Sequence, residues 1–173
     1  MSDKITTIKP PHRQLKDTYN HYGVFLAGSI EMGKAEDWQN AIEDKLKTLA
    51  FFNHIKDEIT LYNPRRDDWD SSWTQDINQP QFYEQVTWEL DRIQNSDLVI
   101  FYFQPTTLSP ITLLELGLCI GSKKSCVVCC PQGYWRKGNV DITCYINDVH
   151  VVETLDELAE YIINDFINSK KRK

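Results

Sequence analysis

The sequence predicts a single α/β domain built on a parallel sheet with helices on both faces. Three observations support this fold class. The chain has 173 residues, the usual size of one domain. Hydrophobic residues make up 41% of the sequence, which is enough for a packed core. Short apolar runs also alternate with amphipathic segments, which is typical of strands joined by crossover helices.

The two ends of the chain differ from its middle. Residues 1–21 are polar and show no periodicity, so we expect an N-terminal arm on the surface. A single domain is expected over residues 22–168. Residues 169–173 are basic and predict a solvated tail.

Two strands are predicted in the first half of the domain. Residues 22–28 form an apolar run that ends in glycine, and both faces of this strand are expected to be buried. A helix is predicted over residues 35–50, where large apolar residues recur at helical spacing. Residues 58–62 predict the second strand, and a long loop follows as far as Pro80.

The second half predicts three more strands and three more helices. In chain order these are a helix over 81–95, a strand over 97–103, a helix over 110–121, strands over 125–130 and 150–152, and a helix over 154–168. Residues 131–149 are expected to be irregular. The alternation predicts a flavodoxin-like, doubly wound sheet of five parallel strands in the order 2-1-3-4-5. In this order, ligands bind beyond the ends of strands 1 and 3.

Charge and composition exclude several classes of protein. The formal net charge is −6, which repels a nucleic-acid polymer. No apolar run is long enough to span a membrane or to act as a signal peptide, so we expect neither a membrane association nor secretion. The five cysteines are odd in number and crowded around one apolar stretch, unlike a disulfide framework. These features predict a cytoplasmic protein.

Two loops are expected to meet at the predicted ligand crevice. One contains Gly28, Ser29 and Ile30, and the other runs from Gln104 to Ser109. The start of a helix offers free N–H groups and a partial positive charge, which favour an anion, and the two serines add hydroxyl groups. Ser109 equally suits a simple N-cap of the helix that Pro110 begins.

Glu115 is the most informative residue for function. Its neighbours within the helix are apolar or small. An ionised carboxylate there costs several kcal/mol unless it is paired or hydrogen-bonded. The alternative to a functional role is a salt bridge with Arg65, Arg66 or Arg92. Glu89 and Asp91 can reach the same region from the preceding helix, and the residue pattern alone does not choose between them.

The loop after the second strand carries further polar candidates. Asn63, Arg65 and Arg66 follow this strand directly, and paired arginines suit a carboxylate or phosphate. Structural ion pairs with acids on the facing helix explain them equally well. The C-x-x-C spacing of Cys126 and Cys129 lies within a strand and lacks a second pair of ligands. No metal site and no cofactor is therefore predicted.

Three motifs together resemble the nucleoside 2-deoxyribosyltransferase superfamily, which includes the 2′-deoxynucleoside 5′-monophosphate N-glycosidases. They are Gly28-Ser29-Ile30, the run from Trp88 to Ile100, and Leu114-Glu-Leu-Gly117. Asn63-Pro-Arg-Arg66 and the run from Gln85 to Leu90 resemble the deoxyribosyltransferase-like branch. The resemblance spans roughly residues 22–165.

The resemblance implies cleavage or transfer at the N-glycosidic bond of a nucleoside or its 5′-monophosphate. It implies Glu115 as the nucleophile that attacks C1′, Glu89 as its acidic partner, and Ser29 and Ser109 at the 5′ end of the substrate. It also implies that no cofactor or metal is needed. Relatives complete their sites across subunit contacts, which implies a homodimer or a larger homo-oligomer.

Some residues depart from the family pattern and keep other functions open. Glycines common before the nucleophile are replaced by residues 110–114, and the arginine and glycine expected after Ile30 are Glu31 and Met32. Glu31 would repel a phosphate. One alternative is therefore a module that binds a nucleotide and catalyses nothing. Another is an NAD glycohydrolase similar to the TIR domains, which place a catalytic glutamate on a flavodoxin-like sheet.

Overall fold

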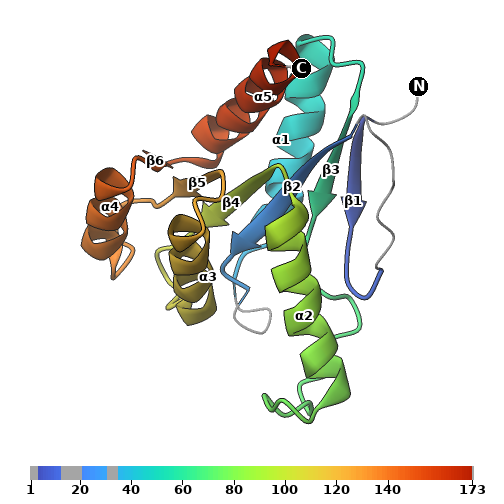
Figure 1. The fold of residues 1–173 in the computed structure, drawn as a ribbon, viewed down its shortest axis with the longest axis vertical. Coiled ribbons are helices and arrows are strands. Elements are labelled where there is room, and N and C mark those ends of the chain that lie inside the picture. Colours follow the sequence, from blue (N-terminus) through green and yellow to red (C-terminus); the bar gives the residue numbers. More distant parts are fainter. Residues whose placement is uncertain (1–3, 13–20, 31–34, 173) are drawn as a thin grey trace.

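The fold is a three-layer α/β sandwich around one parallel sheet (Figure 1). The computed structural model describes residues 4–12, 21–30 and 35–172. The strands are β1 (Ile5–Ile8), β2 (His21–Gly28), β3 (Glu58–Tyr62), β4 (Leu98–Tyr102), β5 (Cys126–Cys129) and β6 (His150–Val152). Their order in the sheet is β1-β3-β2-β4-β5-β6, and every neighbouring pair is parallel.

The prediction of five strands in the order 2-1-3-4-5 is wrong, because the sheet has six strands. The additional strand is β1, which lies within the segment expected to be a surface arm. It pairs with β3 in the register Ile5↔Ile59 to Ile8↔Tyr62, and Ile5 is buried. The other five strands keep the relative order that the sequence predicts, so β2 and β4 remain neighbours in the middle of the sheet.

The helices divide between the two faces of the sheet (Figure 1). They are α1 (Trp38–Phe52), α2 (Pro80–Asn95), α3 (Pro110–Gly121), α4 (Lys137–Ile146) and α5 (Leu155–Lys171). Buried side chains of α1 and α5 pack with one face, and those of α2, α3 and α4 pack with the other. Each face therefore has its own hydrophobic core, and the described helices include none that is long and apolar enough to cross a membrane.

α4 contradicts the prediction that residues 131–149 are irregular. The helix buries only Val140 and Cys144, so the sequence shows no broad apolar stripe. Gly138 and several β-branched residues also lower its helix propensity. Contacts with the sheet, rather than local preference, therefore decide its structure.

Two helix boundaries also differ from those predicted. α1 begins at Trp38 rather than at residue 35, because Oδ1 of Asp37 accepts a 3.3 Å hydrogen bond from the backbone N–H of Asn40 and caps the helix. α5 begins after Thr154, which forms a capping box with Glu157. It continues to Lys171, so most of the expected basic tail is helical.

Candidate active site

The candidate site lies where β2 and β4 end side by side. Gly28, the last residue of β2, pairs with Tyr102, the last residue of β4. From these ends the chain continues to α1 on one face of the sheet and to α3 on the other. This reversal creates the crevice at which doubly wound sheets bind ligands.

Gly28 allows α1 to approach the end of β2. A Cβ atom at this position would lie 2.5 Å from Cζ2 of Trp38 and 2.8 Å from the backbone oxygen of Tyr102. The indole Nε1 of Trp38 also donates a 3.1 Å hydrogen bond to the backbone oxygen of Ser29. Gly28 is thus required for the close packing of α1 on the end of β2.

Three buried hydroxyl groups form a triangle at the crevice. Oγ of Ser29 lies 2.7 Å from Oγ1 of Thr107 and 2.6 Å from Oγ of Ser109, and the last two oxygens are 2.8 Å apart. Ser29 is 1%, Thr107 5% and Ser109 4% exposed, so these contacts are shielded from water. The structure therefore brings together the two serines that the sequence singled out.

The backbone around this hydroxyl triangle holds its members in place. The backbone N–H of Gln104 donates to Oγ of Ser29 at 3.1 Å, and Oγ1 of Thr107 donates to the backbone oxygen of Gln104 at 2.9 Å. Ser109 precedes α3, but its side chain makes no capping hydrogen bond. Its left-handed backbone, with φ 49° and ψ 50°, turns the hydroxyl toward Ser29 instead. The simple N-cap interpretation is therefore wrong.

Glu115 is a buried carboxyl group on α3. Only 8% of the residue is exposed, and among the described residues no hydrogen bond or ion pair reaches its carboxyl group. Burial raises its pKa to about 8, and the negative charge of Glu89 adds to this increase. A carboxyl group kept without a partner is expensive for folding, which is typical of a functional site.

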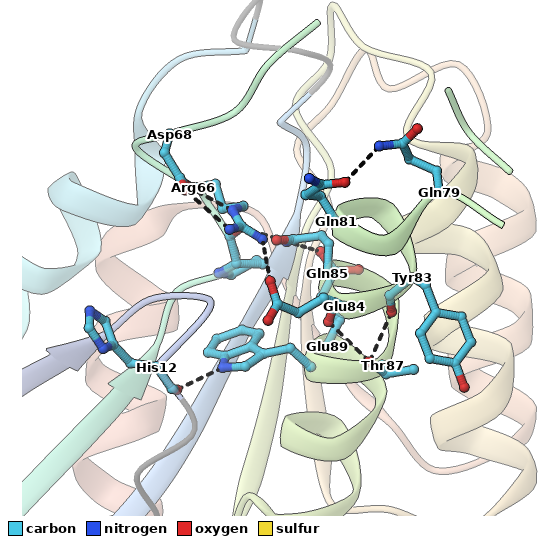
Figure 2. Close-up of polar contacts among 12 residues, drawn as sticks. His12, Arg66, Asp68, Gln79, Gln81, Tyr83, Glu84, Gln85, Thr87 and Glu89 are labelled. Carbon is cyan, nitrogen blue, oxygen red and sulfur yellow. Dashed lines mark hydrogen bonds and ion pairs between the residues drawn. The ribbon is translucent and has the colours of Figure 1, made fainter. Parts of the chain in front are cut away.

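Glu89 approaches the same region from α2. Its Oε1 accepts a 2.8 Å hydrogen bond from Nε2 of Gln85, one turn earlier in the helix (Figure 2). Burial raises the pKa of Glu89 to about 7, although the hydrogen bond from Gln85 opposes the increase. The pKa values of two carboxyl groups from different helices are therefore both raised toward neutral pH.

The expected arginine partners of Glu115 are all engaged elsewhere. The guanidinium of Arg92 stacks over the rings of Tyr62 and Trp88 at 4.8 and 5.7 Å. Nε of Arg65 lies 3.3 Å from Oε1 of Gln39 and 3.6 Å from Oδ1 of Asp37. The alternative of a structural salt bridge at Glu115 is thus not supported by the described contacts.

Arg66 forms structural ion pairs beside α2 (Figure 2). Its Nε lies 2.8 Å from Oδ1 of Asp68, and its Nη1 lies 3.3 Å from Oε2 of Glu84. The guanidinium also lies over the ring of Trp73, 5.1 Å from its centroid, and Trp73 contacts Trp69 edge to face. These contacts order the long loop after β3.

Asn63 and Asp91 have local roles. Oδ1 of the buried Asn63 accepts a 2.9 Å hydrogen bond from the backbone N–H of Arg65, which forms an Asx turn. Asp91 is exposed and accepts a 3.0 Å hydrogen bond from Asn95. Glu89 and Asp91 therefore differ, because the charge of Glu89, and not that of Asp91, raises the pKa of Glu115.

Sequence reasoning missed three polar residues at the site, namely Thr107, Gln104 and Gln85. Their types carry no specific chemical signal. Two of them contact Ser29, more than seventy positions earlier, through the hydroxyl of Thr107 and the backbone N–H of Gln104. The spacing of Gln85 and Glu89 by one helical turn is the one signal that could have linked them. Glu31 and Met32, whose departure from the family pattern argues for a binding module, lie outside the described residues.

Metal ligands do not gather within the part of the chain that the structure describes. No group of three or more histidine, cysteine, aspartate or glutamate side chains there is arranged to hold a metal ion. A shallow depression between α4 and β6 is lined by Ile142, Tyr145 and Val151 and contains neither carboxylate of the site. The candidate site therefore rests on Glu89 and Glu115 rather than on a depression of the surface.

Comparisons with known proteins identify a family and a similar fold. A family model described as "Nucleoside 2-deoxyribosyltransferase like" matches residues 21–134, which include both glutamates and the hydroxyl triangle. No curated protein matches the chain. A solved structure, described as a conserved protein from Enterococcus faecalis V583, has a TM-score of 0.57 and 15% sequence identity, and the match covers 84% of this chain and 99% of that one. This likeness shows the fold alone.

Proposed function

The chain belongs to the nucleoside 2-deoxyribosyltransferase-like family, and on this premise we propose that it is an enzyme that cleaves or transfers the N-glycosidic bond of a (deoxy)nucleoside or its 5′-monophosphate. One observation carries the proposal. Glu89 and Glu115 are electrostatically coupled, and their pKa values are raised to about 7 and about 8. Enzymes that break a bond to an anomeric carbon usually use a pair of carboxyl groups as catalytic residues.

Glu115 is the proposed nucleophile. One of its carboxylate oxygens forms a bond to C1′ of the sugar while the bond from C1′ to the base nitrogen breaks. The electron pair of the broken bond stays on the base, and Glu89 in its acid form delivers a proton to the departing base. The products of this step are the free base and a glycosyl ester of Glu115.

The second step removes the sugar from Glu115. In a hydrolase, water attacks C1′ after Glu89, now ionised, has accepted one of its protons. In a transferase, a nitrogen of a second base attacks C1′ in the same way. Either route returns Glu115 to its carboxylate form and Glu89 to its acid form, so one residue serves as acid and then as base.

The raised pKa values set the protonation state from which the reaction begins. With a pKa of about 8, Glu115 is mainly protonated at neutral pH in the ligand-free protein. Attack requires its carboxylate form. The proton of Glu115 must therefore pass to ionised Glu89 or to water before attack. The positive charge that develops at C1′ in an oxocarbenium-like transition state then stabilises the carboxylate.

The hydroxyl triangle is the proposed site for the 5′ end of the substrate. Ser29 and Ser109 offer hydroxyl groups, and the backbone from Gly28 to Ile30 lies beside them. Because these hydroxyls bond to one another, a 5′-oxygen must replace one of the contacts among Ser29, Thr107 and Ser109. The group bound there is the 5′-hydroxyl of a nucleoside or the 5′-phosphate of its monophosphate.

The polar loop after β3 has a supporting role in this proposal. Asn63, Arg65 and Arg66 shape the loop through their internal contacts, and the Trp69–Trp73 pair lies beside them. We propose that this loop, with Asp91 further away on α2, forms the outer part of the substrate site. The chemistry requires no metal or cofactor.

We also propose an oligomeric state, a cellular location and a small substrate. The family resemblance supports a homodimer or a larger homo-oligomer. A cytoplasmic location is supported by the five cysteines, which are all buried and unpaired. The acidic net charge of −6 favours a small nucleoside or nucleotide over a nucleic-acid polymer.

The test is release of free base from a panel of nucleosides, nucleoside 5′-monophosphates and NAD, measured by chromatography with and without an acceptor base. Wild type should release base from a nucleoside or its monophosphate, and Glu115→Gln should reduce the rate by about 10³-fold or more. Glu160→Gln, an exposed change on α5, is the matched control.

Other outcomes would redirect the assignment. Nucleotide binding without base release would select a binding module, and release of nicotinamide from NAD would select a glycohydrolase of that cofactor. Full base release by Glu115→Gln would exclude this residue as the nucleophile.

A further inference from the structure

Gln85 is a buried glutamine of α2 that links Glu89 to the loop after β3 (Figure 2). The residue is 5% exposed. Its Nε2 donates two hydrogen bonds, one of 2.8 Å to Oε1 of Glu89 and one of 2.9 Å to the backbone oxygen of Pro64. The two protons of a single amide nitrogen are therefore divided between a carboxyl group and a backbone carbonyl.

The contact with Pro64 fixes the orientation of this amide. A backbone carbonyl has no proton and can only accept, so the NH₂ group must face it. Turning the amide over would place its oxygen against the oxygen of Pro64. Oε1 of Gln85 has no hydrogen-bond partner within the described part of the chain, and such a buried acceptor costs roughly 1–3 kcal/mol. The contact with Pro64 thus holds the amide of Gln85 in this orientation although its Oε1 has no hydrogen-bond partner among the described residues.

The position of the Pro64 carbonyl is itself determined by the loop. Asn63 is buried, and its Oδ1 accepts the hydrogen bond from the backbone N–H of Arg65 that closes the turn across Pro64. Nη2 of Arg65 donates a 3.1 Å hydrogen bond to the backbone oxygen of Glu36, at the start of α1. The contacts of Asn63 and Arg65 therefore fix the loop on both sides of Pro64, and the Pro64 oxygen points to Gln85 of α2.

The fixed amide decides how Glu89 can carry a proton. A protonated carboxyl group has one carbonyl oxygen, which is a good acceptor, and one hydroxyl oxygen, which is a donor. Since Gln85 always presents an N–H to Oε1, this oxygen is held as the acceptor whether Glu89 is ionised or neutral. The proton of the neutral form is then favoured on Oε2, because the carbonyl oxygen is the better acceptor of the two.

We propose that Gln85 is a positioning residue that keeps Oε1 of Glu89 as a hydrogen-bond acceptor and makes Oε2 the oxygen that carries and transfers the acid proton. This inference rests on the proposed function for its catalytic meaning, because it assigns the atom of Glu89 that delivers a proton to the leaving base. The hydrogen-bond geometry itself does not depend on that function.

The other charged groups near Glu89 do not replace Gln85. Glu115 on α3 offers no hydrogen bond to it among the described contacts; the charge of Glu89 instead raises the pKa of Glu115. Arg66 lies beside the same part of α2, but its guanidinium binds Asp68 and Glu84 instead. Gln85 is thus the one described group that donates a hydrogen bond to the carboxyl group of Glu89.

The test is infrared difference spectroscopy of the protonated carboxyl group, together with a pH titration of ¹³C-labelled glutamate side chains by NMR. Glu89→Gln identifies the signals of Glu89. In Gln85→Met, the C=O band of protonated Glu89 should move to higher wavenumber because its carbonyl loses a hydrogen bond. The pKa of Glu89 should rise above its wild-type value of about 7, since the bond from Gln85 stabilises the ionised form.

Matched variants separate this effect from general damage to α2. Gln81→Met changes an exposed glutamine of the same helix and should leave the band and the titration unchanged. Gln85→Glu keeps the shape of the side chain but loses the NH₂ group, so it should raise the pKa of Glu89 even if Gln85→Met fails to fold.

An unchanged C=O band in Gln85→Met would overturn the proposal, because it would place the proton on Oε1 or the amide elsewhere. Both readings are spectroscopic and need no turnover, so they remain decisive if the protein releases no base. Where base is released, Gln85→Met should lower kcat by about tenfold or more with little change in KM, and it should shift the pH dependence of kcat upward.

Discussion

The carboxyl group of Glu115 lies within the electrostatic influence of Glu89, although the two residues come from α3 and α2. Neither group forms an ion pair within the described residues, and burial raises both pKa values. Holding two unpaired acids together opposes folding. The arrangement is therefore best explained by chemistry that needs a carboxylate and a carboxylic acid side by side.

Stability should fall as the pH rises through the titration of Glu115. Between the ordinary pKa of 4.5 and the folded value of about 8, the folded chain binds more protons at this residue than the unfolded chain does. The free energy of unfolding therefore decreases over this range. Glu115→Gln removes the titration and should be more stable than wild type at about pH 9, by on the order of 2 kcal/mol.

Urea unfolding at about pH 5 and about pH 9 measures this difference. Glu160→Gln, which is exposed, should follow the wild-type dependence. Equal stability of wild type and Glu115→Gln at the higher pH would show that Glu115 does not bind its proton more tightly when folded.

The hydroxyl triangle should govern both stability and recognition of the 5′ end. Thr107→Val keeps the size of the side chain but leaves Ser29 and Ser109 without one of their oxygen contacts. We expect a loss of about 1–2 kcal/mol in stability and a higher KM for the preferred substrate. Thr107→Ser restores the hydroxyl and should recover KM. A KM that stays at the wild-type value in Thr107→Val would separate the triangle from substrate binding.

Gly28→Ala should destabilise the protein by overpacking. The new Cβ atom meets the ring of Trp38 at 2.5 Å and the backbone of Tyr102 at 2.8 Å, so the end of β2 must move. The expected cost is about 2 kcal/mol, seen as a lower thermal midpoint. Gly138→Ala in α4 is the control, because its Cβ atom would point into open space. Equal midpoints for wild type and Gly28→Ala would contradict the close approach of Trp38.

Tyr22→Phe tests a contact remote from the site. The hydroxyl of Tyr22 in β2 donates a hydrogen bond to the carboxylate of Asp165 in α5, and this contact and burial raise the pKa of Tyr22. Its removal leaves a partly buried carboxylate with a weaker partner set, at a cost of about 1–2 kcal/mol. Denaturant unfolding measures the loss, and Tyr83→Phe at an exposed position should be neutral. Base release should be unchanged; a fall would link this contact to the site.

The sequence predicts the strands from β2 onward well because each contains a short apolar segment. β3 and β6 have the predicted bounds, and β2 and β4 differ by one residue at their ends. Glu115 could likewise be singled out, because an acid among apolar residues is a local anomaly, whereas Glu89 is chosen over Asp91 through the family resemblance. These features need no knowledge of which segments meet in space.

The features that were missed depend on distant contacts. β1 has the sequence Ile-Thr-Thr-Ile, which is too short and too polar to be recognised without its partner β3. Thr107 is an ordinary loop residue until it meets Ser29, seventy-eight positions earlier. Gln85 gains its role only from the carbonyl of Pro64, whose position depends on the turn after β3.

β1 also bears on how the chain folds as it is synthesised. It is synthesised before β2 and α1, yet its one neighbour among the described strands is β3, at residues 58–62, which follow both. β1 therefore cannot pair in the sheet until β3 has been made. A variant that lacks residues up to Ile8 could not form the β1–β3 pair, and the edge of β3 would be open to pairing with other molecules.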